Sequence, residues 1–68
     1  MSIVKVIEVI ASSKKSWSDA AQIAVSEAGK TVKNIKHFYV ESQTATVDSK
    51  GKIKEYRING KISFVIND

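Results

Sequence analysis

Cysteine is absent from this chain of 68 residues, and His37 is its only histidine. The first absence excludes disulfide bonds and thiolate zinc sites, and the second means that a His-rich metal site would have to be shared between subunits. A chain this short removes only about 60% of its unfolded surface from water, so one core leaves little margin against chain entropy. Self-association is the remaining way to add stability. We expect one domain, residues 1–68, that is stable as part of a symmetric oligomer.

Targeting signals and long apolar runs are also missing. The first eleven residues show no basic segment followed by an apolar core and a cleavage site, and no run approaches the ~20 apolar residues of a membrane span. We therefore expect a cytoplasmic protein without membrane contact. The formal net charge is +4, and ten of the eleven basic residues are scattered lysines. This pattern is typical of a solvated surface, and an anionic partner is the less favoured alternative.

Catalytic motifs are missing as well. The three glycines are isolated, no G-x-S-x-G or P-loop is present, and the seven acidic residues are too dispersed for a paired-carboxylate site or an EF-hand. We expect no enzyme, no catalytic residue and no metal ligands. A basic sheet with aromatics also suits single-stranded nucleic acid, but only His37 and Tyr39 could stack on bases and the RNP signature is missing. Nucleic acid is therefore a disfavoured partner.

Two segments of different periodicity open the chain. Residues 3–11 (IVKVIEVIA) are β-branched and apolar on both faces apart from Lys5 and Glu8, which predicts a strand covered on both sides. Residues 11–16 (ASSKKS) predict a loop. A helix then begins after Ser16 as N-cap, with Asp19 as the weaker form of a capping box, and stops at Asn34. Its apolar stripe, spaced i, i+3, i+4, comprises Trp17, Ala20, Ala21, Ala24, Val25, Ala28, Val32 and Ile35.

Three positions of this expected helix invite comment. Gly29 costs a helix about 1 kcal/mol relative to alanine, and close approach of a neighbouring backbone would explain it. Ile23 lies off the stripe, either as an ordinary exposed residue or as a contact with another subunit. Trp17 lies on the stripe, so we interpret it as a core residue rather than a ligand platform.

Two long strands follow, residues 36–48 and about 53–66, separated by a turn at residues 49–52. The second alternates cleanly, with an apolar face of Tyr56, Ile58, Gly60, Ile62, Phe64 and Ile66. Phe38 and Val40 belong with that face, which receives the helix. Tyr39, Ala45 and Val47 are assigned to the other face. Because one helix covers only one face, we expect the second face to bind another subunit.

The hairpin register decides which polar residues lie together. A three-residue loop, residues 49–51, would pair Asp48 with Lys52. His37 then shares the face away from the helix with three cross-strand pairs: Arg57 with Gln43, Asn59 with Glu41, and Lys61 with Tyr39. A one-residue bulge near Lys50 would exchange these faces.

Three segments together resemble the dodecin family: KVIEVIASS at residues 5–13, EAGKTVKNI at residues 27–35 and KEYRINGKISF at residues 54–64. The resemblance covers nearly the whole chain in order and length. It implies an α+β fold of order β-α-β-β, with a three-stranded antiparallel sheet wrapped partly around one helix. It also implies a hollow homododecamer of tetrahedral symmetry. Many dodecins store or sequester flavins (FMN, riboflavin or FAD), stacked in pairs between aromatic residues at two-fold interfaces.

The sequence departs from the flavin-binding pattern at two positions. The tryptophan that stacks on the flavin ring is replaced by His37, and the glutamine that binds the ring edge is replaced by Arg57. Imidazole offers a smaller stacking surface than indole, and arginine only donates hydrogen bonds, so its fork suits phosphate or carboxylate better. The expected cofactor-binding residues are His37, Arg57, Gln43 and Tyr39. The alternative is the same shell without flavin, structural or holding another anionic ligand such as a nucleotide cofactor.

Overall fold

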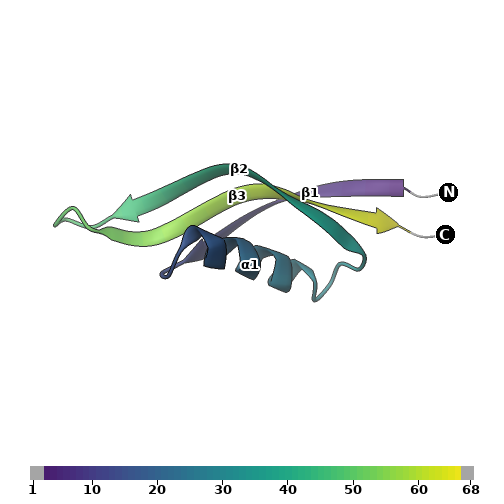
Figure 1. Ribbon diagram of the computed structural model, residues 1–68, viewed down its shortest axis with the longest axis horizontal. Coiled ribbons are helices and arrows are strands. Elements are labelled where there is room, and N and C mark those ends of the chain that lie inside the picture. Colours follow the sequence, from purple (N-terminus) through teal and green to yellow (C-terminus); the bar gives the residue numbers. More distant parts are fainter. Residues whose placement is uncertain (1–2, 67–68) are drawn as a thin grey trace.

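The computed structural model describes residues 3–66, and its elements follow the expected order (Figure 1). Strand β1 (Ile3–Ser13) is followed by helix α1 (Trp17–Ala28) and by strands β2 (Ile35–Val47) and β3 (Ile53–Ile66). The three strands form one antiparallel sheet in the order β1-β3-β2. The predicted fold class, with its β-α-β-β order and single helix, is therefore confirmed.

The molecule is elongated, with principal extents of 53 × 19 × 13 Å. Helix α1 lies along one face of the sheet, which we call the helix face, and the other is the open face (Figure 1). Strand β1 pairs with β3 only as far as Ser13 opposite Tyr56. Beyond that pair β2 and β3 continue alone to their hairpin, and we call this two-stranded extension, residues 45–56, the arm.

The core lies between α1 and the sheet and uses the alternation read from the sequence. Its fully or nearly fully buried apolar residues are Ala20, Ala24, Ile58 and Ile62. The small alanines let the helix backbone lie close to β3, where Ile58 and Ile62 point toward it. Phe38 packs beside them and leaves no space above Gly60, since a Cβ there would lie 2.6 Å from the ring of Phe38 and 2.4 Å from the carbonyl oxygen of Tyr39. A side chain larger than hydrogen does not fit at this position.

The start of α1 has the predicted N-cap, but the Asp19 side chain has another hydrogen-bond partner than predicted. The Ser16 hydroxyl accepts a hydrogen bond from the Asp19 backbone N–H at 2.9 Å, which confirms Ser16 as the N-cap. In place of the expected capping box, the Asp19 carboxylate accepts a 2.6 Å hydrogen bond from the buried Ser13 hydroxyl. This bond joins the helix to the end of β1. The strand therefore runs to Ser13, and the predicted loop from Ala11 was too long.

The end of α1 differs from the prediction. The helix stops at Ala28 with Gly29 as C-cap, six residues before Asn34. The apolar spacing continues to Val32 because the chain keeps turning, with the Val32 N–H bonded to the Ala28 carbonyl at 2.9 Å. The expected close approach of a neighbour to Gly29 was wrong, because a Cβ there would meet only helix carbonyls. Asn34 instead has a positive φ of 63° and bonds to Val65 of β3 as the chain enters β2.

The hairpin closes as predicted, but its register changes along the strands. The Asp48 N–H donates to the Lys52 carbonyl at 2.8 Å, and the Asp48 carboxylate accepts from two N–H groups of the loop. Three irregularities in the β2–β3 pairing then occur, between Thr46 and Val47, between Val40 and Ser42, and between Ile35 and His37. Each changes the register by one residue. Residues 42–46 of β2 therefore pair with residues 55–59 of β3 one residue out of the register that the hairpin alone would set.

The register prediction is therefore right at one of three pairs. Lys61 lies opposite Tyr39 as expected, but Arg57 lies opposite Thr44 instead of Gln43, and Asn59 lies opposite Ser42 instead of Glu41. The cause is the pair of bulges, which make Glu41 an extra residue on β2 and Lys54 one on β3. Ala45 consequently lies opposite Tyr56, on the helix face, and its assignment to the open face was wrong.

Candidate functional site

The open face of the sheet collects large side chains that the protomer leaves uncovered. Alternation from the strand pairs places Val4, Val6 and Ile10 of β1 and Tyr39 of β2 on this face. Their exposed fractions are 61%, 56%, 65% and 65%. Soluble proteins expose single apolar residues routinely, whereas several large apolar side chains on one uncovered face favour an interaction surface. The prediction that this first strand is covered on both sides therefore holds within the protomer only for the helix face, because Val4, Val6 and Ile10 on the open face are exposed.

His37 and Tyr39 both lie on this open face. Ser63 is the partner of His37 and Lys61 is the partner of Tyr39, so the two rings are two residues apart on β2. Both residues are exposed. Side chains spaced in this way on one strand lie about 7 Å apart, near enough for both rings to touch one flat ligand. The structure therefore brings together these two of the four predicted site residues.

Arg57 is on the same face but at a different place. Its Nε donates to the Ser12 hydroxyl at 3.2 Å, and its Nη2 lies 3.8 Å from a Glu55 carboxylate oxygen. Arg57 and Ser63 are six residues apart on β3, which corresponds to about 20 Å along a strand. His37 and Arg57 of one protomer are therefore too far apart to hold the same ring of a flavin.

Gln43 is separated from the other three residues by the thickness of the sheet. It lies opposite Ile58, whose side chain is buried against α1, so Gln43 occupies the helix face. The bulge at Glu41 causes this, because one extra residue reverses the facing of the strand beyond it. The structure does not bring Gln43 together with Arg57, His37 or Tyr39 within one protomer.

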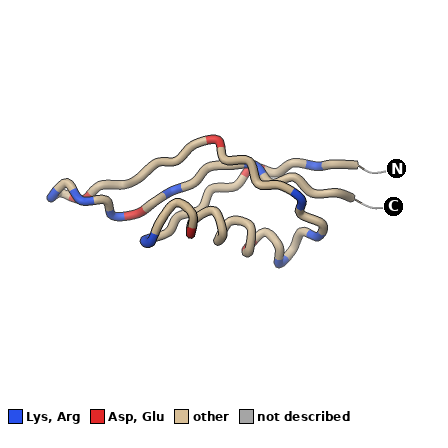
Figure 2. The backbone as a smooth tube through the Cα atoms, viewed as in Figure 1, with Lys and Arg blue, Asp and Glu red and all other residues tan. Residues whose placement is uncertain are grey.

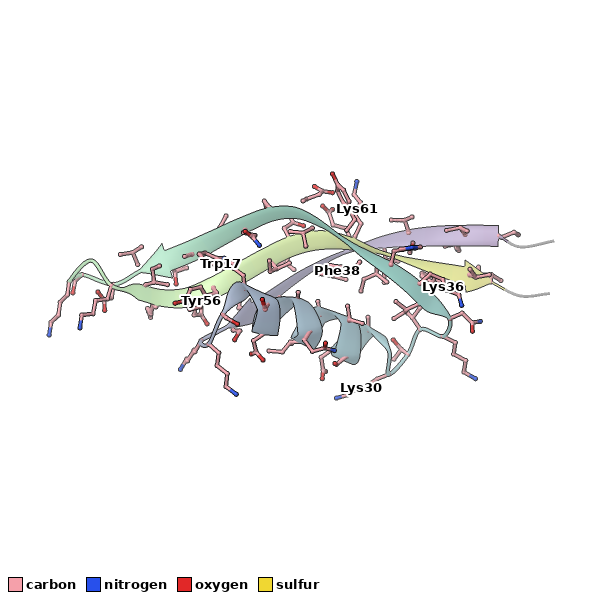
Figure 3. The ribbon with its side chains drawn as sticks, in the orientation of Figure 1. Trp17, Lys30, Lys36, Phe38, Tyr56 and Lys61 are labelled. Carbon is pink, nitrogen blue, oxygen red and sulfur yellow. The ribbon has the colours of Figure 1, made fainter. Side chains whose placement is uncertain are left out.

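A row of charged residues crosses the middle of the open face, and the sequence did not single it out. Glu8 of β1 lies opposite Lys61 of β3, and the Lys61 ammonium is 3.0 Å from a Glu41 carboxylate oxygen. The hydrogen bond that Lys61 donates to the Glu41 carboxylate raises the pKa of Lys61 above its ordinary value, with further attraction from the charges of Glu41 and Glu8. Lys61 points away from the helix (Figure 3). The predicted register placed both Lys61 and Glu41 on this face but did not pair them with each other.

Trp17 lies on the helix side, away from this surface, as its place on the apolar stripe predicted. It is half-buried, its indole N–H donates to the Thr44 carbonyl at 2.8 Å, and its ring meets Tyr56 edge to face with centroids 4.8 Å apart. Figure 3 shows Trp17 and Tyr56 together at the arm end of the helix. Trp17 is therefore a packing residue at the base of the arm.

Residues 3–66 contain neither a metal cluster nor a membrane-spanning helix. No group of three or more His, Asp or Glu side chains in this part of the chain is arranged to hold a metal ion. No helix there is long and apolar enough to cross a membrane. The Lys and Arg residues of the same range are spread along the molecule, over the strands, the hairpin and both ends of the helix (Figure 2). Their distribution is that of a solvated surface.

Comparison with known proteins gives consistent results. The family model described as Dodecin matches residues 3–67. The chain is 45% identical over 64 residues, 94% of its length and 89% of the relative's, to a protein named calcium dodecin from Mycobacterium tuberculosis. Among solved structures, that calcium dodecin, described as calcium-chelating with a calcium-binding site, superimposes with a TM-score of 0.82 at 42% identity, covering 96% of this chain and 91% of its own. A variant of the Thermus thermophilus dodecin gives a TM-score of 0.92 at 25% identity, with full coverage of both chains.

Proposed function

Because the chain belongs to the dodecin family, we propose that it assembles into a homododecamer that stores or sequesters a small ligand, with flavin as the first candidate. The observation that carries this proposal is the open face, where Val4, Val6, Ile10 and Tyr39 are each more than half exposed. Burying such a surface contributes about 25 cal/mol for each Å² of apolar area. A second copy on this face would supply the stability that so short a chain lacks.

The placement of the site residues supports a ligand held between subunits. His37 and Tyr39 of one protomer offer two exposed rings, while Arg57 of that protomer lies about 20 Å away along β3. A two-fold contact between open faces is self-complementary, so it can bring Arg57 of one copy toward His37 of the other. We propose that the flavin ring stacks on His37 and Tyr39 in such an interface.

Arg57 points to an anionic form of the ligand. Its guanidinium carries only donors, and Ser12 and Glu55 already hold it on the open face. A phosphate accepts from such a fork, whereas the N–H of a flavin ring edge does not. We therefore propose FMN over riboflavin. A nucleotide cofactor without flavin is the alternative ligand of the same chemistry.

Fluorescence titration tests the flavin proposal directly. FMN emission is followed while wild-type protein is added, and we expect quenching because stacked flavin loses its emission. Tyr39→Ala and His37→Ala should each weaken binding by about tenfold, since one stacked ring contributes about 1–3 kcal/mol. Thr46→Ala, on the arm away from these rings, is the control.

Replacement of the Arg57 guanidinium by an amide tests whether the ligand carries a phosphate. Arg57→Gln should weaken FMN binding and strengthen riboflavin binding, because an amide both donates and accepts. Unquenched FMN at high protein concentration would contradict flavin binding. Quenching of both flavins to the same extent by wild type and Arg57→Gln would contradict the role of the phosphate.

Calcium is a second candidate ligand, favoured by the 45% identity to a protein named calcium dodecin. Glu8 and Glu41 flank Lys61 on the open face, and carboxylate oxygens are the ligands that calcium prefers. Within one protomer they are too few, so we propose that copies would have to share the ion. Isothermal titration with calcium chloride, against magnesium chloride as the control, tests this. A heat of calcium binding that is present in the wild type and absent in Glu41→Gln would support the proposal. The absence of any heat of binding in the wild type would exclude it.

A further inference from the structure

The arm is the part of the sheet with the least support. The last pair between β1 and β3 is Ser13 with Tyr56, and the helix begins at Trp17, beside the same level of the sheet. Beyond this level β2 and β3 have only each other as partners in the described chain. Isolated two-stranded hairpins are marginally stable, so the direction of the arm depends on what holds its base.

Trp17 contacts β2 and β3 at the base of the arm. Its indole N–H donates to the carbonyl of Thr44 on β2 at 2.8 Å, and its ring packs edge to face on Tyr56 of β3. Thr44 is the pairing partner of Arg57, and Tyr56 is its neighbour along the chain. Trp17 therefore contacts, from the helix face, the two residues that flank Arg57 (Figure 3).

The Arg57 side chain leaves the same point on the opposite face. There Ser12 and Glu55 orient its guanidinium, but those partners fix only the side chain relative to its own strands. The position of the strands themselves relative to β1 and α1 depends on the contacts below them. We propose that Trp17 is a positioning residue for Arg57. Its hydrogen bond to Thr44 and its ring contact with Tyr56 fix the base of the arm, and the base of the arm determines the position of the Arg57 guanidinium on the open face. As a statement about ligand binding, this rests on the proposed function.

The test is Trp17→Phe, which keeps an aromatic ring but removes the N–H donor. We expect the dissociation constant for FMN to rise about fivefold, the loss of one hydrogen bond of ordinary strength. In the Arg57→Ala background the same change should alter FMN binding by less than twofold, because Trp17 acts through Arg57. Ser18→Ala, at an exposed position beside Trp17, is the matched control and should leave FMN binding unchanged.

Amide hydrogen exchange provides a readout that needs no ligand. We expect Trp17→Phe to speed exchange across residues 45–56 by a similar factor and to leave residues 58–63 unchanged. Tyr56→Leu, which removes the ring contact but retains the indole N–H, should have the same pattern if Trp17→Phe does not fold. If wild-type protein does not bind FMN, the proposed function fails while the exchange experiment still decides the role of Trp17. Unchanged exchange in the arm, or equal effects of Trp17→Phe with and without Arg57, would overturn the inference.

Discussion

The two faces of the sheet are made by the same three strands but differ in how far the protomer buries them. On the helix face, Ile58 and Ile62 are buried against the alanines of α1. On the open face, Val6 and Ile10 of the edge strand are more than half exposed, and Glu41 and Lys61 pair beside them. The chain thus completes one core by itself and presents a second apolar surface without a cover. We infer that the helix face determines folding of the protomer and the open face determines assembly and ligand binding.

Truncation of a buried isoleucine should give the largest effect on the free energy of unfolding. Ile62 is fully buried, so Ile62→Ala should cost about 3 kcal/mol, from lost transfer energy and the cavity left behind. The matched change on the open face, Ile10→Ala, should lower the free energy of unfolding less, because Ile10 is more than half exposed in the protomer. Urea unfolding followed by circular dichroism at fixed protein concentration measures both variants. Equal losses would contradict the division between the two faces.

A methyl group added beneath Phe38 should give the next largest effect. Gly60→Ala would place its Cβ 2.4 Å from a backbone carbonyl oxygen, and such overpacking costs about 2 kcal/mol. Gly51→Ala is the control, since its Cβ meets nothing and only the positive φ of 80° is strained, at about 1 kcal/mol. Urea unfolding should therefore give a lower midpoint for Gly60→Ala than for Gly51→Ala. A Gly60→Ala variant as stable as wild type would mean that Phe38 does not lie over Gly60.

Loss of the ion pair between Lys61 and Glu41 should have the smallest effect on stability. The hydrogen bond to Glu41 raises the pKa of Lys61 above 10.5, so its stabilisation is complete below pH 10.5 and is lost as the pH rises through the higher folded value. Glu41→Gln should lower this pKa toward 10.5, as measured by NMR titration of the lysine side-chain resonances. Glu55→Gln, whose carboxylate is paired with Arg57, should leave it unchanged. A Lys61 pKa that does not respond to Glu41→Gln would show that the pair does not form in solution.

Most of the fold could be predicted because its elements obey simple periodicities. The alternation of β3 identified the helix face, and the alanine stripe located the helix and its N-cap at Ser16. The end of the helix was missed because Val32 continues the stripe through a turn. A bulge near the hairpin was allowed for as an alternative, but the bulge at Glu41 was missed because an inserted polar residue looks like any other in an alternating strand.

The candidate site was predicted only in part for the same reason. His37, Tyr39 and Arg57 were correctly placed on the open face, although the assumed pairing of Arg57 was wrong. Gln43 was misplaced by the Glu41 bulge. The separation of His37 from Arg57 along β3 depends on no unusual residue and could have been counted from the register. The pairing of Glu41 with Lys61 was not singled out, although the predicted register also placed both side chains on the open face.

The most direct test of this account is the mass of the protein in solution, measured by light scattering after size-exclusion chromatography of wild type and Ile10→Asp. We predict a twelve-subunit particle for the wild type and a much smaller species for Ile10→Asp, because a charge would lie in the open-face contact. A monomeric wild type, or a twelve-subunit particle unaffected by Ile10→Asp, would contradict the claim that the open face holds the assembly together.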